Sequence, residues 1–283
     1  MTPAVSIGLP VYNGVRFLPD ALTSLLAQEH VQFELLISDN ASTDATEPLC
    51  RALRDPRIRY VRQSVNRGAA WNFAYVLAHA TAPYFLWAAA DDRWAPTFLR
   101  RCRRELDAHP DAVLCHSQGQ EMSPEGDPFG RAYTGLAAVD PQPRRRWRQV
   151  LADLRWHIGV YGVMRTCALR HTRGLQATWG SDHVLMAELA LQGPLRQVPA
   201  TLWWHRRPVH ISPHEAYSLV LKKLDPAQPI PPRRWTALAM HRQYWALTQP
   251  RPMGYKWDVV WNYGARGGWK QDVVESLCSW RHP

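Results

Sequence analysis

Short apolar runs and amphipathic segments alternate regularly over the first 116 residues. The apolar runs are rich in β-branched and aromatic side chains and end at polar or proline positions, which is typical of buried strands. Between them, apolar side chains recur at the spacing of one helical face. We expect strands over residues 5–9, 33–38, 58–61, 84–88 and 112–115. We expect helices after Asp20, after the cap-rich segment 39–44, over 69–80 and from Pro96.

Strands separated by helices in this way predict βαβ units, and therefore an α/β fold with a mostly parallel sheet. Right-handed crossovers would place the strand-to-helix loops on one edge of the sheet, where ligands usually bind. The pattern is weaker beyond residue 116. There we expect a surface excursion over 117–148, a strand over 158–164, a helix over 182–191 and an extended segment over 195–205.

The composition changes again at about residue 213. Six of the fourteen tryptophans lie in residues 214–283, among basic side chains and prolines. We expect this segment to be a helical appendage to a domain of residues 1–213. Its tryptophans and cations suit a lipid interface or stacked bases, and they suit a packed subdomain or a dimer contact equally well.

The charge of the chain narrows the class of ligand. It carries 34 Lys and Arg residues against 24 Asp and Glu residues, a net charge of +10, and only four of the 34 are lysine. Guanidinium groups hold phosphates bidentately, so nucleic acid, anionic lipid and nucleotide-type substrates all fit this charge.

The sequence disfavours a membrane-spanning or a secreted protein and indicates a cytoplasmic one. The longest apolar run, 84–90, is too short for a membrane helix, and the N-terminus lacks a secretion-signal pattern. The five cysteines are odd in number and form no C-x-x-C pair. We therefore expect buried thiols in a reducing, cytoplasmic compartment.

The candidate chemistry lies in acids at the ends of expected strands. Asp39 follows the second strand, Asp91 and Asp92 follow the fourth, and Asp182 begins a later helix. Adjacent aspartates repel unless a cation compensates them, and a hard divalent ion takes one or two carboxylates together with substrate phosphates. Each acid would also suit a helix N-cap, with Ser181 competing for that role beside Asp182. Taken singly, these residues leave both interpretations open.

Four segments taken in order are more specific. They are Leu9-Pro10-Val11-Tyr12-Asn13, Asp39-Asn40-Ala41-Ser42-Thr43-Asp44-Ala45-Thr46, Asn66-Arg67-Gly68 and Trp87-Ala88-Ala89-Ala90-Asp91-Asp92-Arg93-Trp94. This set resembles the family 2 glycosyltransferases, from Val5 to about Cys115 and more thinly to about Ser212.

The resemblance implies a GT-A fold, with a nucleotide-sugar-binding half over 1–116 and an acceptor and catalytic half over 117–213. It implies metal-dependent, inverting transfer of a sugar from a nucleotide-sugar donor, expected to be a UDP-sugar, to an acceptor hydroxyl. The context would be the synthesis of a polysaccharide, an O-antigen or another glycoconjugate.

The resemblance also assigns roles in the first half. Its nucleotide-sugar-binding residues would be Pro10, Tyr12, Asn13, Asp39, Asn66, Gly68 and Asp91. Of these, Asp39 would hydrogen-bond the base, expected to be uracil, and Asp91 would face the ribose or the sugar. Asp92 would bind the divalent metal, Mn²⁺ or Mg²⁺. Ala90 departs from the family's D-x-D pattern, which leaves the ribose contact open.

In the second half, Asp182 matches the aspartate that takes the acceptor proton, although Ser181 replaces the usual glutamate. Residues 203–212 resemble the family's R-x-H-x-x-S-type segment. Arg207 and His210 would therefore contact the leaving diphosphate, with a purely structural role for His210 equally open.

The implied partners are a nucleotide-sugar donor and a glycan or lipid-linked acceptor, without nucleic acid. Peripheral membrane contact through 214–283, at the inner face of the membrane, and a homodimer are further expectations. One alternative is a nucleotidyltransferase, but that class would have a glycine-rich loop after the first strand, where residues 9–14 contain only Gly14. The other is a non-catalytic basic module that binds membrane or nucleic acid.

Overall fold

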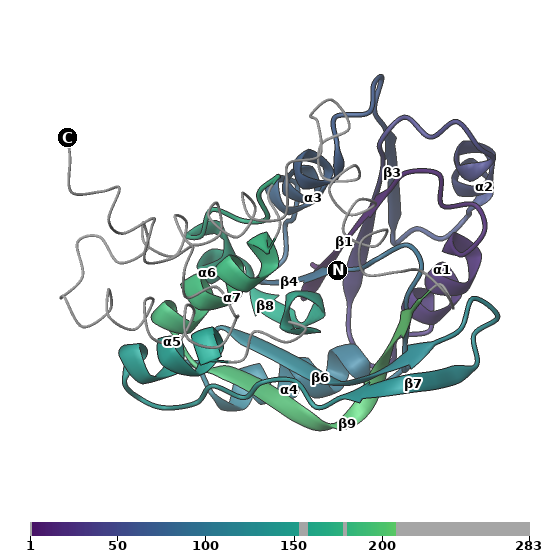
Figure 1. The fold of residues 1–283 in the computed structure, drawn as a ribbon. Coiled ribbons are helices and arrows are strands. Elements are labelled where there is room, and N and C mark those ends of the chain that lie inside the picture. The colour runs from purple at the N-terminus through teal and green to yellow at the C-terminus, as the bar shows by residue number, and fades with distance from the viewer. Residues whose placement is uncertain (1, 153–157, 178–179, 208–283) are drawn as a thin grey trace, which may run out of the picture.

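The computed structural model describes residues 2–152, 158–177 and 180–207 (Figure 1). The expected helical appendage over 214–283 and His210 lie outside the described residues, as does the end of the domain expected over 1–213. In chain order the elements are β1 (Val5–Val11), α1 (Leu18–Leu26), β2 (Phe33–Asp39), α2 (Thr46–Ala52), β3 (Ile58–Arg62), α3 (Ala69–Ala78), β4 (Tyr84–Trp87), β5 (Arg93–Trp94), α4 (Phe98–Ala108), β6 (Leu114–Met122), β7 (Pro128–Tyr133), α5 (Pro143–Ala152), the 3₁₀ helix η1 (Ile158–Tyr161), β8 (Val163–Arg165), α6 (Thr166–Arg170), α7 (Ser181–Gln192) and β9 (Leu195–Arg206).

The first four strands form the parallel half of the sheet, in the order β3-β2-β1-β4. Their helices follow the predicted βαβ pattern, and the carboxyl ends of the strands meet at one edge. The register pairs Val11 with Asp39, so the loops after β1 and β2 leave the sheet side by side. Helix α4 begins at Phe98, two residues later than Pro96, with Thr97 at its N-cap position.

The second half of the sheet is mixed, which corrects the expectation of a mostly parallel sheet. β8 is antiparallel to both β4 and β6, β6 is parallel to β9, and β5 and β7 pair antiparallel with β9 and β6. The expected surface excursion over 117–148 is also wrong. β6 continues through this region to Met122, β7 returns beside it, and α5 follows. Figure 1 shows β6, β7 and β9 running together along one end of the molecule.

Two apolar clusters cover the two faces of the sheet. One packs side chains of α1 and α4, such as Leu22 and Leu99, against alternate residues of β1 and β2. The other packs α3, α5 and α7 against the opposite face, with Val76, Trp147 and Leu185 at its centre. Each fully buried side chain of this size stabilises the fold by about 1.5–3 kcal/mol. The strands that carry the candidate acids are therefore rigidly held.

The cysteines and the helices bear on two further expectations. Cys50, Cys102 and Cys115 are buried free thiols, as predicted, but Cys167 is exposed. In the part of the chain that the structure describes, every helix is too short or too polar to cross a membrane.

Candidate active site

The loops after β1 and β2 are fastened to each other by hydrogen bonds. The backbone N–H groups of Asn13, Gly14 and Val15 donate to Ser42 Oγ, Thr46 Oγ1 and Asp44 Oδ2, over 2.9, 2.9 and 3.1 Å. In return, Asn13 Oδ1 accepts from the N–H of Thr43 at 2.8 Å. Asn13 itself has a left-handed backbone, with φ of 52°.

These hydrogen bonds hold the loop that carries Pro10 and Tyr12, two of the residues expected to contact the nucleotide. Tyr12 is 47% exposed beside the fastened loop, and Pro10 is partly exposed. The D-N-A-S-T-D-x-T segment therefore acts largely as scaffold for the loop after β1.

Asp39 is the central acid of this region, and it is fully buried. Its Oδ1 accepts from the N–H of Ser42 and its Oδ2 from the hydroxyl of Tyr60, both at 2.8 Å. Burial and this bond to Asp39 raise the pKa of the Tyr60 phenol. The N-cap of α2 is Ala45, so Asp39 does not cap that helix.

The Asn66-Arg67-Gly68 turn is held by Asn40, a residue that the sequence did not single out. Asn40 Nδ2 donates to Asn66 Oδ1 and to the carbonyl of Gly68, over 2.8 and 3.1 Å. Asn40 Oδ1 accepts from the N–H of Arg67 at 3.0 Å. Gly68 has a φ of 83° and a ψ of 162°, a backbone conformation that glycine adopts readily. Asn40 therefore brings the Asn66 and Gly68 loop against the end of β2.

Asp92 is also fully buried, and it fastens β9 to the loop after β4. Its Oδ2 accepts from Trp203 Nε1 at 3.1 Å. Its Oδ1 accepts from His205 Nδ1 at 3.0 Å and from the N–H of Arg206 at 3.1 Å. Burial works to lower the pKa of His205, but the charge and hydrogen bond of Asp92 raise it above its ordinary value.

Asp91 differs from its neighbour because it is partly exposed. Its backbone carbonyl accepts from Arg206 Nε at 2.9 Å. The buried Arg206 also pairs with Asp20 of α1 and donates to the carbonyls of Ser123 and Pro124, and it thereby fixes the loop that carries Asp91. The N-cap of α4 is Thr97, so the alternative role of Asp91 and Asp92 as caps of that helix is wrong.

Asp182 lies in the first turn of α7 and is partly exposed. The N-cap of this helix is Gly180, in a left-handed conformation with φ of 73°. Neither Asp182 nor Ser181 occupies the cap position, which removes the structural role that competed with catalysis.

Tyr161, at the end of η1, shows that these acids converge. Burial raises the pKa of its phenol, and so do the negative charges of Asp92, Asp91 and Asp182, in that order. Asp182, which is distant along the chain from the adjacent Asp91 and Asp92, therefore lies within electrostatic reach of the same phenol. No sequence pattern singles out Tyr161, because it lies in a segment expected to be a plain strand.

Arg207 is the last described residue of the predicted diphosphate segment. Its Nη1 donates to Glu121 Oε1 at 2.7 Å, and the hydroxyl of Tyr133 donates to the same oxygen at 2.6 Å. Burial lowers the pKa of Arg207, but its pairing with Glu121 outweighs this and raises it.

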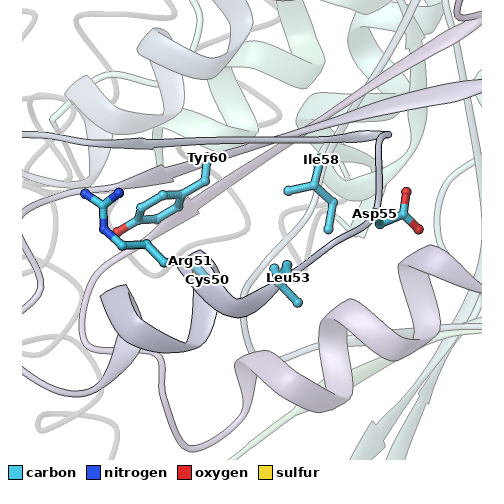
Figure 2. A pocket seen from close by; sticks show the side chains of 6 residues that line it. All are labelled: Cys50, Arg51, Leu53, Asp55, Ile58 and Tyr60. Carbon is cyan, nitrogen blue, oxygen red and sulfur yellow. The ribbon is translucent and has the colours of Figure 1, made fainter.

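A cavity of about 470 Å³ lies between α2 and β3 (Figure 2). Tyr60 and Arg51 lie at one end of it and Asp55 at the other, with Cys50, Leu53 and Ile58 completing the lining. None of the predicted site residues lines this cavity. Tyr60 connects it to the candidate site, because its hydroxyl bonds to Asp39.

The donor set fits a divalent cation that is shared with a ligand. Within residues 2–152, 158–177 and 180–207, no three His, Cys, Asp or Glu side chains form a metal-binding group. Mg²⁺ and Mn²⁺ are commonly held by one or two carboxylates together with substrate phosphates, and the partly exposed Asp91 offers such a carboxylate.

Comparisons with known proteins identify the family and the fold of this chain. Residues 6–179 match the family model described as Glycosyl transferase family 2. The abequosyltransferase RfbV of Salmonella typhimurium is 35% identical over 116 residues, which cover 39% of this chain and 35% of RfbV. The chain spans 35% to 40% of the length of the first curated relatives that it matches.

Two solved structures share the fold. S. aureus TarS (1–349) in complex with UDP-GlcNAc has a TM-score of 0.61 at 15% identity, covering 97% of this chain and 83% of that one. The mannosyltransferase PcManGT from Pyrobaculum calidifontis, in complex with GDP-Man and Mn²⁺, has a TM-score of 0.55 at 17% identity, covering 99% and 80%. The fold is thus the GT-A fold of glycosyltransferases. The chain belongs to glycosyl transferase family 2.

Proposed function

We propose that this protein transfers a sugar from a nucleotide-sugar donor to an acceptor hydroxyl, with inversion at the anomeric carbon and with the help of a divalent metal. The observation that carries the proposal is that η1 joins the two acidic segments: it packs on α7 through Gly159 and Met186, and it leads into β8, whose Val163 pairs with Leu86 near the carboxyl end of β4. Family membership and the fold shared with TarS support it.

For the metal ligand, burial favours Asp91 over Asp92, the residue expected from the sequence. Both oxygens of Asp92 already accept hydrogen bonds inside the protein, and its side chain is fully buried. Asp91 is partly exposed on the loop that Arg206 fixes. We therefore assign the metal to Asp91 and give Asp92 the role of holding β9 in place. The bound metal would neutralise negative charge on the departing diphosphate.

Asp182 is the proposed general base. Its carboxylate would take the proton of the acceptor hydroxyl as that oxygen forms a bond to the anomeric carbon. The bond from the anomeric carbon to the phosphate oxygen breaks in the same step, and its electron pair leaves with the nucleoside diphosphate. Asp182 is suited to this role by its partial exposure and by its place in the first turn of α7, outside the cap position.

Arg207 and His210 are the proposed contacts for the leaving diphosphate. A guanidinium group suits this task because it can donate two parallel hydrogen bonds to a phosphate. Arg207 is paired with Glu121, so it would share its donors between that carboxylate and the ligand.

The nucleotide would bind over the fastened loops, with Tyr12 beside the base. The proposed contact of Asp39 with the base requires that nucleotide binding opens access to its carboxylate, because Asp39 is fully buried and both of its oxygens accept bonds from Ser42 and Tyr60. Asn13, Asn66 and Gly68 would complete this half of the site with Pro10. We propose UDP as the nucleotide, a choice supported by the UDP-GlcNAc complex of TarS, whereas PcManGT is described with GDP-Man.

The proposed acceptor is a growing glycan or a lipid-linked glycan. The names of the abequosyltransferase RfbV and of the putative colanic acid biosynthesis glycosyl transferase WcaA of Escherichia coli support this class. A cytoplasmic location, with peripheral membrane contact or dimerisation through 214–283, completes the proposal. Flotation of the full chain with anionic liposomes would test the membrane contact.

The function is tested by incubating the full chain with Mn²⁺ and UDP-, GDP- or dTDP-sugars and measuring release of the nucleoside diphosphate. Release from one nucleotide class, lost when the metal is chelated, is the expected result. Turnover of nucleoside triphosphates alone would instead support a nucleotidyltransferase. Absence of binding and turnover for every donor would overturn the proposal.

A further inference from the structure

Tyr161 stands out because, among the described residues, its hydroxyl has no hydrogen-bond partner, although it lies near the candidate acids. Within the described residues, the side chain makes a ring contact with Trp203 but no hydrogen bond. By contrast, the hydroxyls of Tyr60, Tyr84 and Tyr133 each donate to a carboxylate oxygen. A partly buried phenol without a partner loses hydrogen bonding with water and gains none from the protein.

The surrounding structure holds the ring of Tyr161 in place. It stacks on Trp203, with ring centroids 5.5 Å apart and planes inclined by 23°. On the same strand, Trp203 stacks on His205, with centroids 5.4 Å apart, and Asp92 accepts a hydrogen bond from each of these two side chains. The carboxylate that fastens β9 therefore also fixes the surface on which Tyr161 rests.

The backbone on either side of Tyr161 packs closely against β6 and α7. A Cβ atom at Gly162 would lie 2.8 Å from the carbonyl oxygen of Cys115 in β6, and one at Gly159 would lie 2.5 Å from Cε of Met186 in α7. The two glycines let the turn pack directly on both elements. Tyr161 thus occupies a fixed position between the end of the sheet and the helix that carries Asp182.

This position selects the part of the donor that Tyr161 can reach. In the proposed function, Asp91 holds the metal and diphosphate, and Asp182 faces the acceptor. The anomeric carbon must lie between them. Tyr161 lies there too, because its ring stacks on Trp203, which bonds to Asp92, and its turn packs on the helix that carries Asp182. The sugar ring is therefore the part of the donor closest to this hydroxyl, whereas the base lies towards the loops after β1 and β2.

We propose that the hydroxyl of Tyr161 hydrogen-bonds to a polar substituent of the sugar being transferred, so that Tyr161 helps to select the sugar of the donor. This inference rests on the proposed function. A site built to hydrogen-bond a substrate group discriminates strongly against an isomer that presents that group elsewhere, because the polar atom of the site is then left unpaired.

Tyr161→Phe in the full chain tests the proposal, because it removes the hydroxyl and keeps the ring stacked on Trp203. Hydrolysis of UDP-glucose, UDP-galactose, UDP-N-acetylglucosamine and GDP-mannose is measured with Mn²⁺, together with binding of UDP alone. For the best donor, kcat/KM should fall about 10- to 100-fold, with a smaller fall for the others. The ratio of kcat/KM between the best donor and the other donors should therefore decrease. The affinity for UDP and the melting temperature should be unchanged.

Tyr133→Phe is the matched control. The ring of Tyr133 also packs near Trp203, at 6.2 Å between centroids, but its hydroxyl donates to Glu121. This variant should have a lower melting temperature and unchanged ratios of kcat/KM between sugars, since any effect passed through Arg207 to the diphosphate is common to all donors.

Unchanged sugar ratios in Tyr161→Phe would overturn the inference, as would an equal loss for every donor and for UDP. A change confined to the KM of an acceptor would also overturn it, by placing Tyr161 on the acceptor side. If the wild-type chain neither binds nor hydrolyses any donor, the proposed function fails together with the inference, and that result is distinct from a failure of Tyr161 alone.

Discussion

The carboxyl edge of the sheet has two regions that are built differently. Beside β1 and β2, Asp39 is fully buried and both of its oxygens accept hydrogen bonds from the protein. Beside β4 and α7, Asp91 and Asp182 are partly exposed, and Tyr161 presents a hydroxyl without a partner among the described residues. Asp92 lies next to the second region, but like Asp39 it is fully buried and both of its oxygens accept hydrogen bonds from the protein.

This difference separates two uses of the same residue type. An aspartate at a strand end can organise the fold or serve the ligand, and its position along the chain does not distinguish the two. Burial does distinguish them. From this difference in burial, we assign Asp91 and Asp182 to the proposed reaction, and Asp39 and Asp92 to holding loops and strands in place.

The largest effect is expected at Asp182. Asp182→Asn removes the proposed base, so turnover should fall by about 10²- to 10⁴-fold. Because the side chain is partly exposed, UDP-sugar binding and the melting temperature should remain as in the wild type. Steady-state release of UDP and thermal shift measure the two properties. Asp111→Asn, at an exposed position, is the control. Retained turnover would remove Asp182 from the chemistry.

The adjacent pair offers the sharpest contrast. Asp92→Asn should reduce the free energy of unfolding by about 3 kcal/mol, because it disturbs a buried carboxylate that accepts from Trp203, His205 and Arg206. Asp91→Asn should change it by no more than about 0.5 kcal/mol while abolishing metal-dependent turnover. Urea unfolding of both variants tests this, and equal destabilisation would erase the distinction between the two acids.

A smaller effect is expected at Asp39. Asp39→Asn should destabilise the protein by about 1–3 kcal/mol, since an amide cannot accept both bonds, and Tyr60→Phe should cost about 1 kcal/mol. If Asp39 also contacts the base, UDP affinity should fall in Asp39→Asn and persist in Tyr60→Phe. Calorimetric titration with UDP measures this. An equal loss of affinity in both variants would assign Asp39 to the scaffold alone.

The smallest effect concerns the pH dependence of stability beside Asp182. Burial lowers the pKa of His183 to about 4, below its value in the unfolded chain. As pH falls below about 6.5, the unfolded chain binds a proton that the folded one does not, so stability should drop by about 1 kcal/mol by pH 5.5. His183→Asn should flatten this slope in urea unfolding at the two pH values. An unchanged slope would show that His183 stays accessible to protons.

The parallel half of the sheet could be predicted from the sequence because each βαβ unit there buries its own apolar side chains. Strands β1 to β4 end within two residues of the expected positions. β6 extends beyond its expected end because its buried polar residues find partners far along the chain. His116 bonds to the carbonyl of Leu136, and Glu121 accepts from Tyr133 and Arg207. A local pattern of hydrophobic and polar positions cannot contain such partners.

The same limit applies to the candidate site. The acids could be found because aspartates at strand ends are visible in the sequence. Their separate uses could not, because Trp203 and Asp92 are 111 positions apart and their hydrogen bond exists only in the folded chain. Asn40, Tyr161 and Arg206 were missed for this reason, since each acts through a contact with another segment.

Titration of UDP into the full chain, with and without Mn²⁺, tests most directly the division of labour between Asp91 and Asp92. It is performed on the wild type, Asp91→Asn and Asp92→Asn at a temperature where all three are folded. Asp91→Asn should lose the gain in affinity that Mn²⁺ provides, and Asp92→Asn should keep it. The reverse result would place the metal on the buried aspartate and contradict the assignment of the exposed one.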